Sequence, residues 1–188
     1  MAQAKTLTER ELKKVLEYLR HRKHGFRDRV MLLMTVWSGM RVGEVASLRV
    51  RDVMDTDARV KDEVHLDRTQ TKGKHARTVF LPKKLRDELG RYLIAISPAD
   101  RERPVFATQR NSAFSANTLA QHFFYLYKRA GLEGASSHSG RRTFITNLAS
   151  KGVSVRVLAS LAGHRSISTT QAYIDVNDEM KRRAVELI

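Results

Sequence analysis

The chain has 188 residues and carries 35 lysines and arginines against 20 aspartates and glutamates, which gives a formal net charge of +15. This length fits one domain, or one domain with a small appendage, and a hydrophobic fraction of 41% is enough for a core. The lack of cysteine excludes disulfides and thiolate chemistry, no apolar run could span a membrane, and the first residues lack the apolar centre of a signal peptide. We therefore expect a cytoplasmic protein without a membrane partner.

The excess of positive charge creates a long-range field that attracts polyanions. A pI near 10.5 is typical of a domain that binds nucleic acid. The lysines and arginines are spread along the chain rather than gathered on one amphipathic helix, which argues against binding to a membrane surface. Nucleic acid is therefore the expected partner, and a basic surface that only favours solubility is the alternative.

The first predicted element is a helix over residues 7–22. Thr8 and Glu11 fit a capping box, and Leu7 and Leu12 occupy the positions of a hydrophobic staple. Apolar residues then recur at helical spacing on one face, at Leu12, Val15, Leu16 and Leu19.

Two further helices and a hairpin follow. Residues 27–38 include the apolar run VMLLMTVW, which indicates a buried helix that ends at Gly39. A short helix is expected at 42–48. Residues that favour strands then cluster in 63–70 and 77–82, on either side of the charged turn TKGKHA, which predicts an antiparallel hairpin.

Helical patterns return after the hairpin. Residues 83–96 predict a helix, and 97–104 a loop. Ser115 can cap the next helix, which Gly131 ends. Its apolar face comprises Leu119, Phe123, Leu126 and Tyr127.

Residues 138–174, HSGRRTFITNLASKGVSVRVLASLAGHRSISTTQAYI, fit three short helices with stops near Gly152 and Gly163. The whole pattern predicts an α+β fold, mainly α-helical with one small antiparallel hairpin, in a single domain over residues 1–188. This last stretch also concentrates polar chemistry, because it holds two histidines, several arginines and a late tyrosine.

His138 and Arg141 are three residues apart, so at the start of a helix they project from nearly the same face. Ser136 or Ser137 would cap that helix and leave backbone N–H groups that favour an anion. The guanidinium of Arg141 can bond two phosphate oxygens at once. The pair therefore predicts a phosphate clamp.

The order of these residues resembles the hallmark of the tyrosine recombinase (phage integrase) family, Arg…Lys…His-x-x-Arg…His/Trp…Tyr. GMRVGEVASL resembles its first box, TKGKHARTVFLP its catalytic hairpin, HSGRRTF its His-x-x-Arg box, and LAGHRSISTTQAYI its last box with the nucleophile. The resemblance covers essentially the whole chain and implies the family's catalytic-domain fold. It assigns the catalytic set as Arg41, Lys72, His138, Arg141, His164 and Tyr173, with Glu44 in a supporting role.

Each position also has a plainer explanation. Tyr173 could be an ordinary amphipathic tyrosine, and Arg41 with Glu44 could be a surface pair one helical turn apart. Lys74 competes with Lys72 as the catalytic lysine, although the family's Lys-Gly near the turn favours Lys72. The presence of all four boxes, in the order that the family shows, argues against coincidence.

The resemblance implies a site-specific DNA recombinase or integrase that cleaves and rejoins DNA through a 3′-phosphotyrosine, without metal or ATP. Arg41 and Arg141 would grip the non-bridging phosphate oxygens while Tyr173 attacks phosphorus. His138 would accept the tyrosine proton, and Lys72 would protonate the departing 5′-oxygen.

In the same scheme His164 would hydrogen-bond the scissile phosphate, and Glu44 would orient the arginine and histidine side chains. No zinc motif or phosphate-binding glycine loop points to a cofactor. The implied partners are double-stranded DNA, three further copies in a homo-tetramer on DNA, and an accessory DNA-bending protein. Without DNA we expect a monomer or weak oligomer, and in the cell a nucleoid-associated location.

Two features depart from most members of the family. No helical core-binding domain precedes the catalytic boxes, so we expect either a fragment or a naturally short member. The tail over 175–188 is short, and an amphipathic helix with Met180, Ala184 and Leu187 on one face could dock on a neighbouring protomer or on its own domain. A non-catalytic DNA-binding regulator and a type IB topoisomerase are the competing functions.

Overall fold

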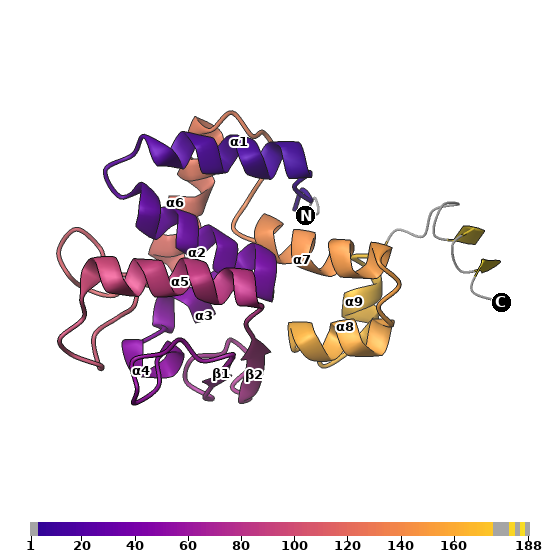
Figure 1. Cartoon of the computed structure of the whole chain (residues 1–188). Coiled ribbons are helices and arrows are strands. Elements are labelled where there is room, and N and C mark those ends of the chain that lie inside the picture. The colour runs from indigo at the N-terminus through magenta and orange to yellow at the C-terminus, as the bar shows by residue number, and fades with distance from the viewer. Residues whose placement is uncertain (1–3, 175–180, 183–184, 187–188) are drawn as a thin grey trace.

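The computed structural model describes residues 4–174, 181–182 and 185–186. Within these residues the chain forms nine named helices and one two-stranded sheet (Figure 1). The elements are α1 Glu9–Arg20, α2 Gly25–Ser38, α3 Val42–Ser47, α4 Val50–Val53, β1 Glu63–Leu66, β2 Arg77–Phe80, α5 Lys83–Ile96, α6 Ala116–Arg129, α7 Ser139–Ser150, α8 Val155–Ala162 and α9 Ile167–Gln171. The expected fold class, mainly helical with a small antiparallel sheet, is confirmed.

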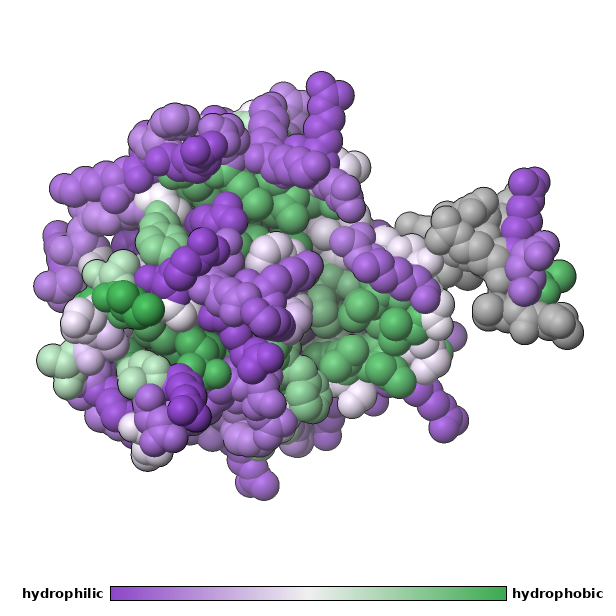
Figure 2. All heavy atoms as spheres, in the orientation of Figure 1, coloured by the Kyte–Doolittle hydropathy of each residue, from purple (hydrophilic) through white to green (hydrophobic). Residues whose placement is uncertain are grey.

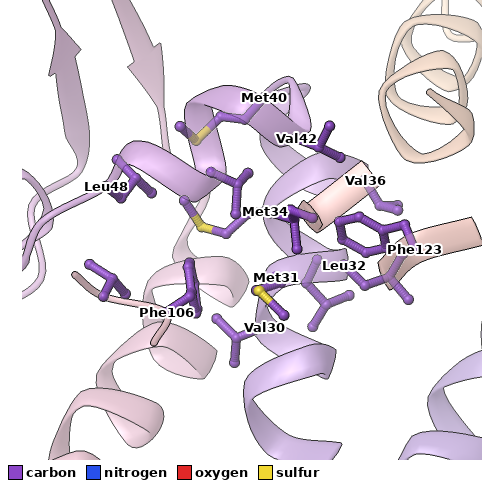
Figure 3. Packing of buried hydrophobic residues seen from close by; sticks show 14 of the residues in the cluster. Val30, Met31, Leu32, Met34, Val36, Met40, Val42, Leu48, Phe106 and Phe123 are labelled. Atoms are coloured by element: carbon purple, nitrogen blue, oxygen red, sulfur yellow. The ribbon is translucent and has the colours of Figure 1, made fainter. Parts of the chain in front are cut away.

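Helix α2 is the centre of the domain, and it packs against α1, α3, α5 and α7 (Figure 1). Its run from Met31 to Met34 is completely buried, as the apolar pattern predicted. Figure 3 shows Met31, Leu32 and Met34 among side chains that include Phe106 and Phe123. Burial of this kind contributes about 1.5–3 kcal/mol for each large apolar side chain, so α2 provides much of the stability on which the site rests.

Helix α1 begins as the sequence predicted. The Thr8 hydroxyl accepts a hydrogen bond from the Glu11 amide at 3.2 Å, and the Glu11 carboxylate accepts one from the Thr8 amide at 3.0 Å. Helix α5 likewise has the expected bounds, with Pro82 at its N-cap. Helix α6 is capped by Ser115, whose hydroxyl accepts from the Thr118 amide at 3.0 Å.

The hairpin is antiparallel as expected, with Glu63 opposite Phe80. Its first strand is shorter than residues 63–70 because the chain turns at Asp67. The Asp67 carboxylate accepts hydrogen bonds from the amides of Thr69 at 2.7 Å and Gln70 at 3.1 Å, and these local bonds compete with strand pairing. Helix α4, a single turn, was not predicted.

The start of α7 corrects one expectation. Neither Ser136 nor Ser137 is the N-cap; that position is taken by His138, without a side-chain cap. The reason is a turn ahead of the helix, in which the Ser139 amide donates to the Ser136 carbonyl at 2.9 Å and the Ser139 hydroxyl accepts from the Ser136 amide at 2.9 Å. The backbone of α7 then lies close to α2, since a Cβ on Gly140 would come within 2.0 Å of the Thr35 hydroxyl.

The last three named helices lie together beside α2 and the hairpin (Figure 1). Hydrophilic residues cover much of the face in Figure 2, and hydrophobic residues gather over α8, where Val157 is exposed. Met180, Ala184 and Leu187, which the amphipathic-tail hypothesis requires, lie outside the described residues. No helix in the described part of the chain is long and apolar enough to cross a membrane.

Candidate active site

The buried carboxylate of Glu44 organises one side of the site. Glu44 is only 1% exposed and lies in the first turn of α3. It accepts from the Arg41 amide at 2.8 Å and from the Arg41 guanidinium at 3.0 Å. It also accepts two hydrogen bonds from Arg77 on β2, at 3.1 and 2.6 Å. Among the described contacts it makes no hydrogen bond to His138 or His164, so its expected link to the histidines is not seen.

Arg141 lies at the bottom of the site and is 5% exposed. Its guanidinium donates to the Gly39 carbonyl at 2.7 Å, at the end of α2, and to the Ala162 carbonyl, at the end of α8. Burial, followed by the charge of Arg41, lowers the pKa of Arg141 to about 9. The side chain remains a cation at neutral pH, held by two helix ends whose carbonyls carry partial negative charge.

Three arginines converge on the C-terminal end of α8, where the carbonyls of residues 161–163 point away from the helix. The donor and acceptor pairs are Arg77 to Leu161 at 2.9 Å, Arg141 to Ala162, and Arg41 to Gly163 at 3.3 Å. These carbonyls are the ones a helix end leaves without partners, so arginines from three distant segments satisfy them. We call this arrangement the three-arginine cap.

His164 follows the cap directly and faces the tyrosine. Its Nδ1 lies 2.9 Å from the hydroxyl of buried Thr170 on α9. The imidazole stacks on the Tyr173 ring with centroids 5.8 Å apart and an angle of 18° between the planes. The guanidinium of Arg142 lies 5.4 Å from the centroid of the Tyr173 ring. The tyrosine backbone is held by the Thr146 hydroxyl, which donates to its carbonyl at 3.3 Å.

A hollow of about 510 Å³ opens between the hairpin and the segment after α8. Arg41, Lys72 and His164 all line it, whereas Lys74 is not among its lining residues. Lys72 is exposed at the start of the hairpin turn. We call this space the hairpin hollow; it is bordered by cations on several sides and is suited to an anion of phosphodiester size.

Both candidate histidines have a lowered pKa. For His164, burial together with the charges of Arg141 and Arg41 lowers the pKa to about 4. For His138, loss of hydration lowers the pKa, and Lys72 and the two arginines contribute further. Both imidazoles are therefore neutral near pH 7, when each can accept or donate a proton.

The Glu44 carboxylate stays ionised. Burial alone would raise its pKa, but hydrogen bonds and charge from Arg77, then from Arg41, lower it below the ordinary value. Removing either cation would leave a buried charge with weaker compensation. The carboxylate is thus a fixed negative centre around which the arginines are arranged.

Five residues of the expected catalytic set are brought together, since Arg41, Lys72 and His164 line the hairpin hollow, Arg141 meets Arg41 at the three-arginine cap, and Tyr173 stacks on His164. The sixth, His138, is the N-cap of α7. Sequence reasoning missed Arg77, Thr170 and Arg142. A signal for Arg77 exists, because it lies two residues before buried Val79 on a strand and therefore on the same inward face. A guanidinium on such a face requires partners.

Three comparisons place this geometry among known proteins. A family model described as "Phage integrase family" matches residues 5–180. The tyrosine recombinase XerA of Thermococcus kodakarensis is 33% identical, over 97% of this chain and 62% of its own length. A crystal structure of a XerA recombinase has a TM-score of 0.78 at 26% identity, over 100% of this chain and 66% of that one.

The XerH site-specific recombinase bound to a palindromic difH substrate, in a post-cleavage complex, has a TM-score of 0.72. It is 24% identical over 96% of this chain and 51% of that chain, so this likeness concerns the fold alone. In each case the chain spans less than two thirds of the relative's length. The matched parts agree with the helical fold and hairpin described above.

Proposed function

This chain belongs to the phage integrase family, and on that basis we propose that it is a tyrosine-type site-specific DNA recombinase. Its reaction is the cleavage and rejoining of double-stranded DNA through a 3′-phosphotyrosine, without metal or ATP. The observation that supports this proposal most directly is the Tyr173 ring stacked on His164 beside the three-arginine cap. A nucleophile, proton-transfer groups and paired cations are the parts that phosphoryl transfer requires.

In the proposed step the Tyr173 oxygen bonds to phosphorus as the bond from phosphorus to the 5′-oxygen breaks. The phenol proton moves to His138, and Lys72 gives a proton to the departing 5′-oxygen. Arg41 and Arg141 stabilise the two negative charges that collect on the non-bridging oxygens. Attack by a 5′-hydroxyl on the phosphotyrosine reverses each of these transfers and rejoins the DNA.

The state of the histidines fits these roles. His138 is neutral near pH 7 because its pKa is lowered, so it can accept the proton of a phenol whose own pKa is near 10. His164 uses Nδ1 toward Thr170, which leaves Nε2 for a hydrogen bond to the phosphate. Lys72 lines the hairpin hollow and Lys74 does not, which supports Lys72 as the acid.

The proposed partner is double-stranded DNA, and the net charge of +15 supports it. Exchange between two duplexes requires cleavage of both strands at both sites, so we propose a homo-tetramer on DNA. An accessory DNA-bending protein and docking of the tail on a neighbouring protomer remain parts of the proposal. A cytoplasmic, nucleoid-associated location follows from such a substrate.

The test is covalent capture on labelled duplexes from sequence beside the gene, nicked so that the released fragment diffuses away. Wild type should give a DNA-linked band that survives SDS, and Tyr173→Phe should give none. Tyr18→Phe is the matched control, since Tyr18 lies on α1 away from the site, and it should keep the band. A band that persists in Tyr173→Phe would exclude Tyr173 as the nucleophile.

Salt-sensitive binding without any covalent band in wild type would instead favour the non-catalytic regulator. A type IB topoisomerase would give the band and relax supercoiled DNA, but would not exchange strands between two duplexes. Strand exchange between two labelled duplexes therefore separates it from a recombinase.

A further inference from the structure

We propose that Arg77, which lies outside the expected catalytic set, is a positioning residue of this site. Its role is to neutralise Glu44, so that the charge of Arg41 is directed at the phosphate, and to fix the helix end that precedes His164. The inference rests on the proposed function for its meaning in catalysis. Its geometry stands on the contacts of Arg77 itself.

All three nitrogen groups of the Arg77 guanidinium are engaged within the protein. Nε and Nη2 donate to the two oxygens of Glu44 at 3.1 and 2.6 Å, and Nη1 donates to the Leu161 carbonyl at 2.9 Å. The side chain is only 10% exposed. Arg77 lines the hairpin hollow together with Arg41, and its planar fork joins α3 to the end of α8. With each of its nitrogens already donating within the protein, we assign it the ordering of its neighbours.

Arg41 holds the same carboxylate less fully. It gives Glu44 one guanidinium hydrogen bond at 3.0 Å, and its side chain is 26% exposed and lines the hairpin hollow. Because Arg77 satisfies both carboxylate oxygens, Arg41 is not the only cation available to Glu44. Without Arg77, a carboxylate that is 1% exposed would depend on Arg41 for its compensation.

The local charge balance leads to the same conclusion. Arg41 and Arg77 contact the Glu44 carboxylate, and Arg141 meets them at the end of α8, so these three guanidiniums and one carboxylate carry two net positive charges. A phosphodiester carries one negative charge and gains a second as the tyrosine oxygen adds to it. Loss of Arg77 would leave a single net positive charge against that second negative charge.

Arg77 also packs directly on the segment that leads to His164. A Cβ on Gly163 would lie 2.6 Å from the Arg77 Cδ, so the arginine side chain lies flat against the glycine. Lys72 belongs to the same hairpin as Arg77. Arg77 therefore links the hairpin that carries Lys72 to the segment that carries His164.

The experiment compares wild type, Arg77→Ala, Arg77→Lys and Arg29→Ala in single-turnover cleavage of the nicked duplex at saturating protein. Arg29 is the matched control because it makes the same two-point contact, with Glu88 at 3.1 and 2.7 Å, between α2 and α5. Rates are expressed per folded molecule, from thermal unfolding of each variant. DNA affinity is measured in parallel, so that binding and the chemical step are separated.

We expect Arg77→Ala to slow cleavage about 10- to 100-fold, less than the loss of a direct transition-state donor, with DNA affinity little changed. Arg77→Lys should recover only part of the rate, since an ammonium keeps the charge without the fork. Arg29→Ala should cleave as wild type does. On a methylphosphonate at the scissile position, which carries no negative charge, the deficit of Arg77→Ala should shrink.

A wild-type rate for Arg77→Ala, or a deficit that stays the same on the neutral phosphate, overturns the proposal. If wild-type protein cleaves no DNA, the proposed function fails, and Arg77 is then judged by NMR titration of His164. Arg77 is one of the cations that keep the pKa of His164 low. Arg77→Ala should raise that pKa and Arg77→Lys should not, and an unchanged pKa in both rejects the role of Arg77.

Discussion

Replacing Gly163 by alanine tests the link between backbone geometry and chemistry. Gly163 has φ +60 and Gly152 has φ +84, so alanine at either position is placed in the left-handed region, which costs about 1–2 kcal/mol. No heavy atom lies within 4 Å of a Cβ on Gly152, whereas a Cβ on Gly163 lies 2.6 Å from the Arg77 Cδ. The two variants thus share the backbone strain and differ in whether Arg77 is displaced.

Both variants should unfold at lower temperature, by about 2–4 °C for each kcal/mol at this chain length. Gly152→Ala should keep the wild-type cleavage rate per folded molecule. Gly163→Ala should lose about 10- to 100-fold, as Arg77→Ala does, because Arg77 must leave Glu44 or Leu161 to avoid the methyl group. Equal cleavage rates for the two alanine variants would refute the reasoning that connects Gly163 to Arg77.

Further predictions concern the start of α1, the ionisation of His164 and its partner. Thr8→Ala removes half of a capping box, so urea denaturation should show a loss of about 1 kcal/mol, and an unchanged midpoint would contradict this. Since the pKa of His164 is about 4 in the folded chain and ordinarily 6.5, the unfolded chain binds the extra proton between these values. Stability should therefore fall as the pH falls from 6.5 to 4, and His164→Asn should flatten that slope. Thr170→Val keeps the side-chain shape but removes the partner of Nδ1, so cleavage should slow about 10-fold while DNA affinity holds; equal rates would exclude an orienting role.

Much of the fold was predictable because local patterns agree with the final packing. The capping box at Thr8, the apolar run of α2 and the bounds of α5 needed no knowledge of distant contacts. The start of α7 was predicted wrongly because a serine turn competes with the helix cap ahead of His138. The outcome depends on which of the two hydrogen-bonding patterns is more stable in the folded protein, and residue types alone do not decide it.

The candidate site was likewise predictable only in part. The family expected from the ordered boxes is confirmed by the match over residues 5–180, but the boxes did not reveal the three-arginine cap. Its acceptors are backbone carbonyls at the end of α8. Every residue has such a carbonyl, so residue types do not show which ones will accept a hydrogen bond. Arg77 was overlooked because its two partners, Glu44 and Leu161, lie far from it along the chain in opposite directions.

The order of synthesis determines when the three-arginine cap can form. Arg41, Glu44 and Arg77 leave the ribosome well before residues 161–163, which supply the carbonyls that these arginines and Arg141 share. A nascent chain that ends before α8 holds the cations without the acceptors that align them. The three-arginine cap can therefore form only late in synthesis, after the end of α8 has left the ribosome.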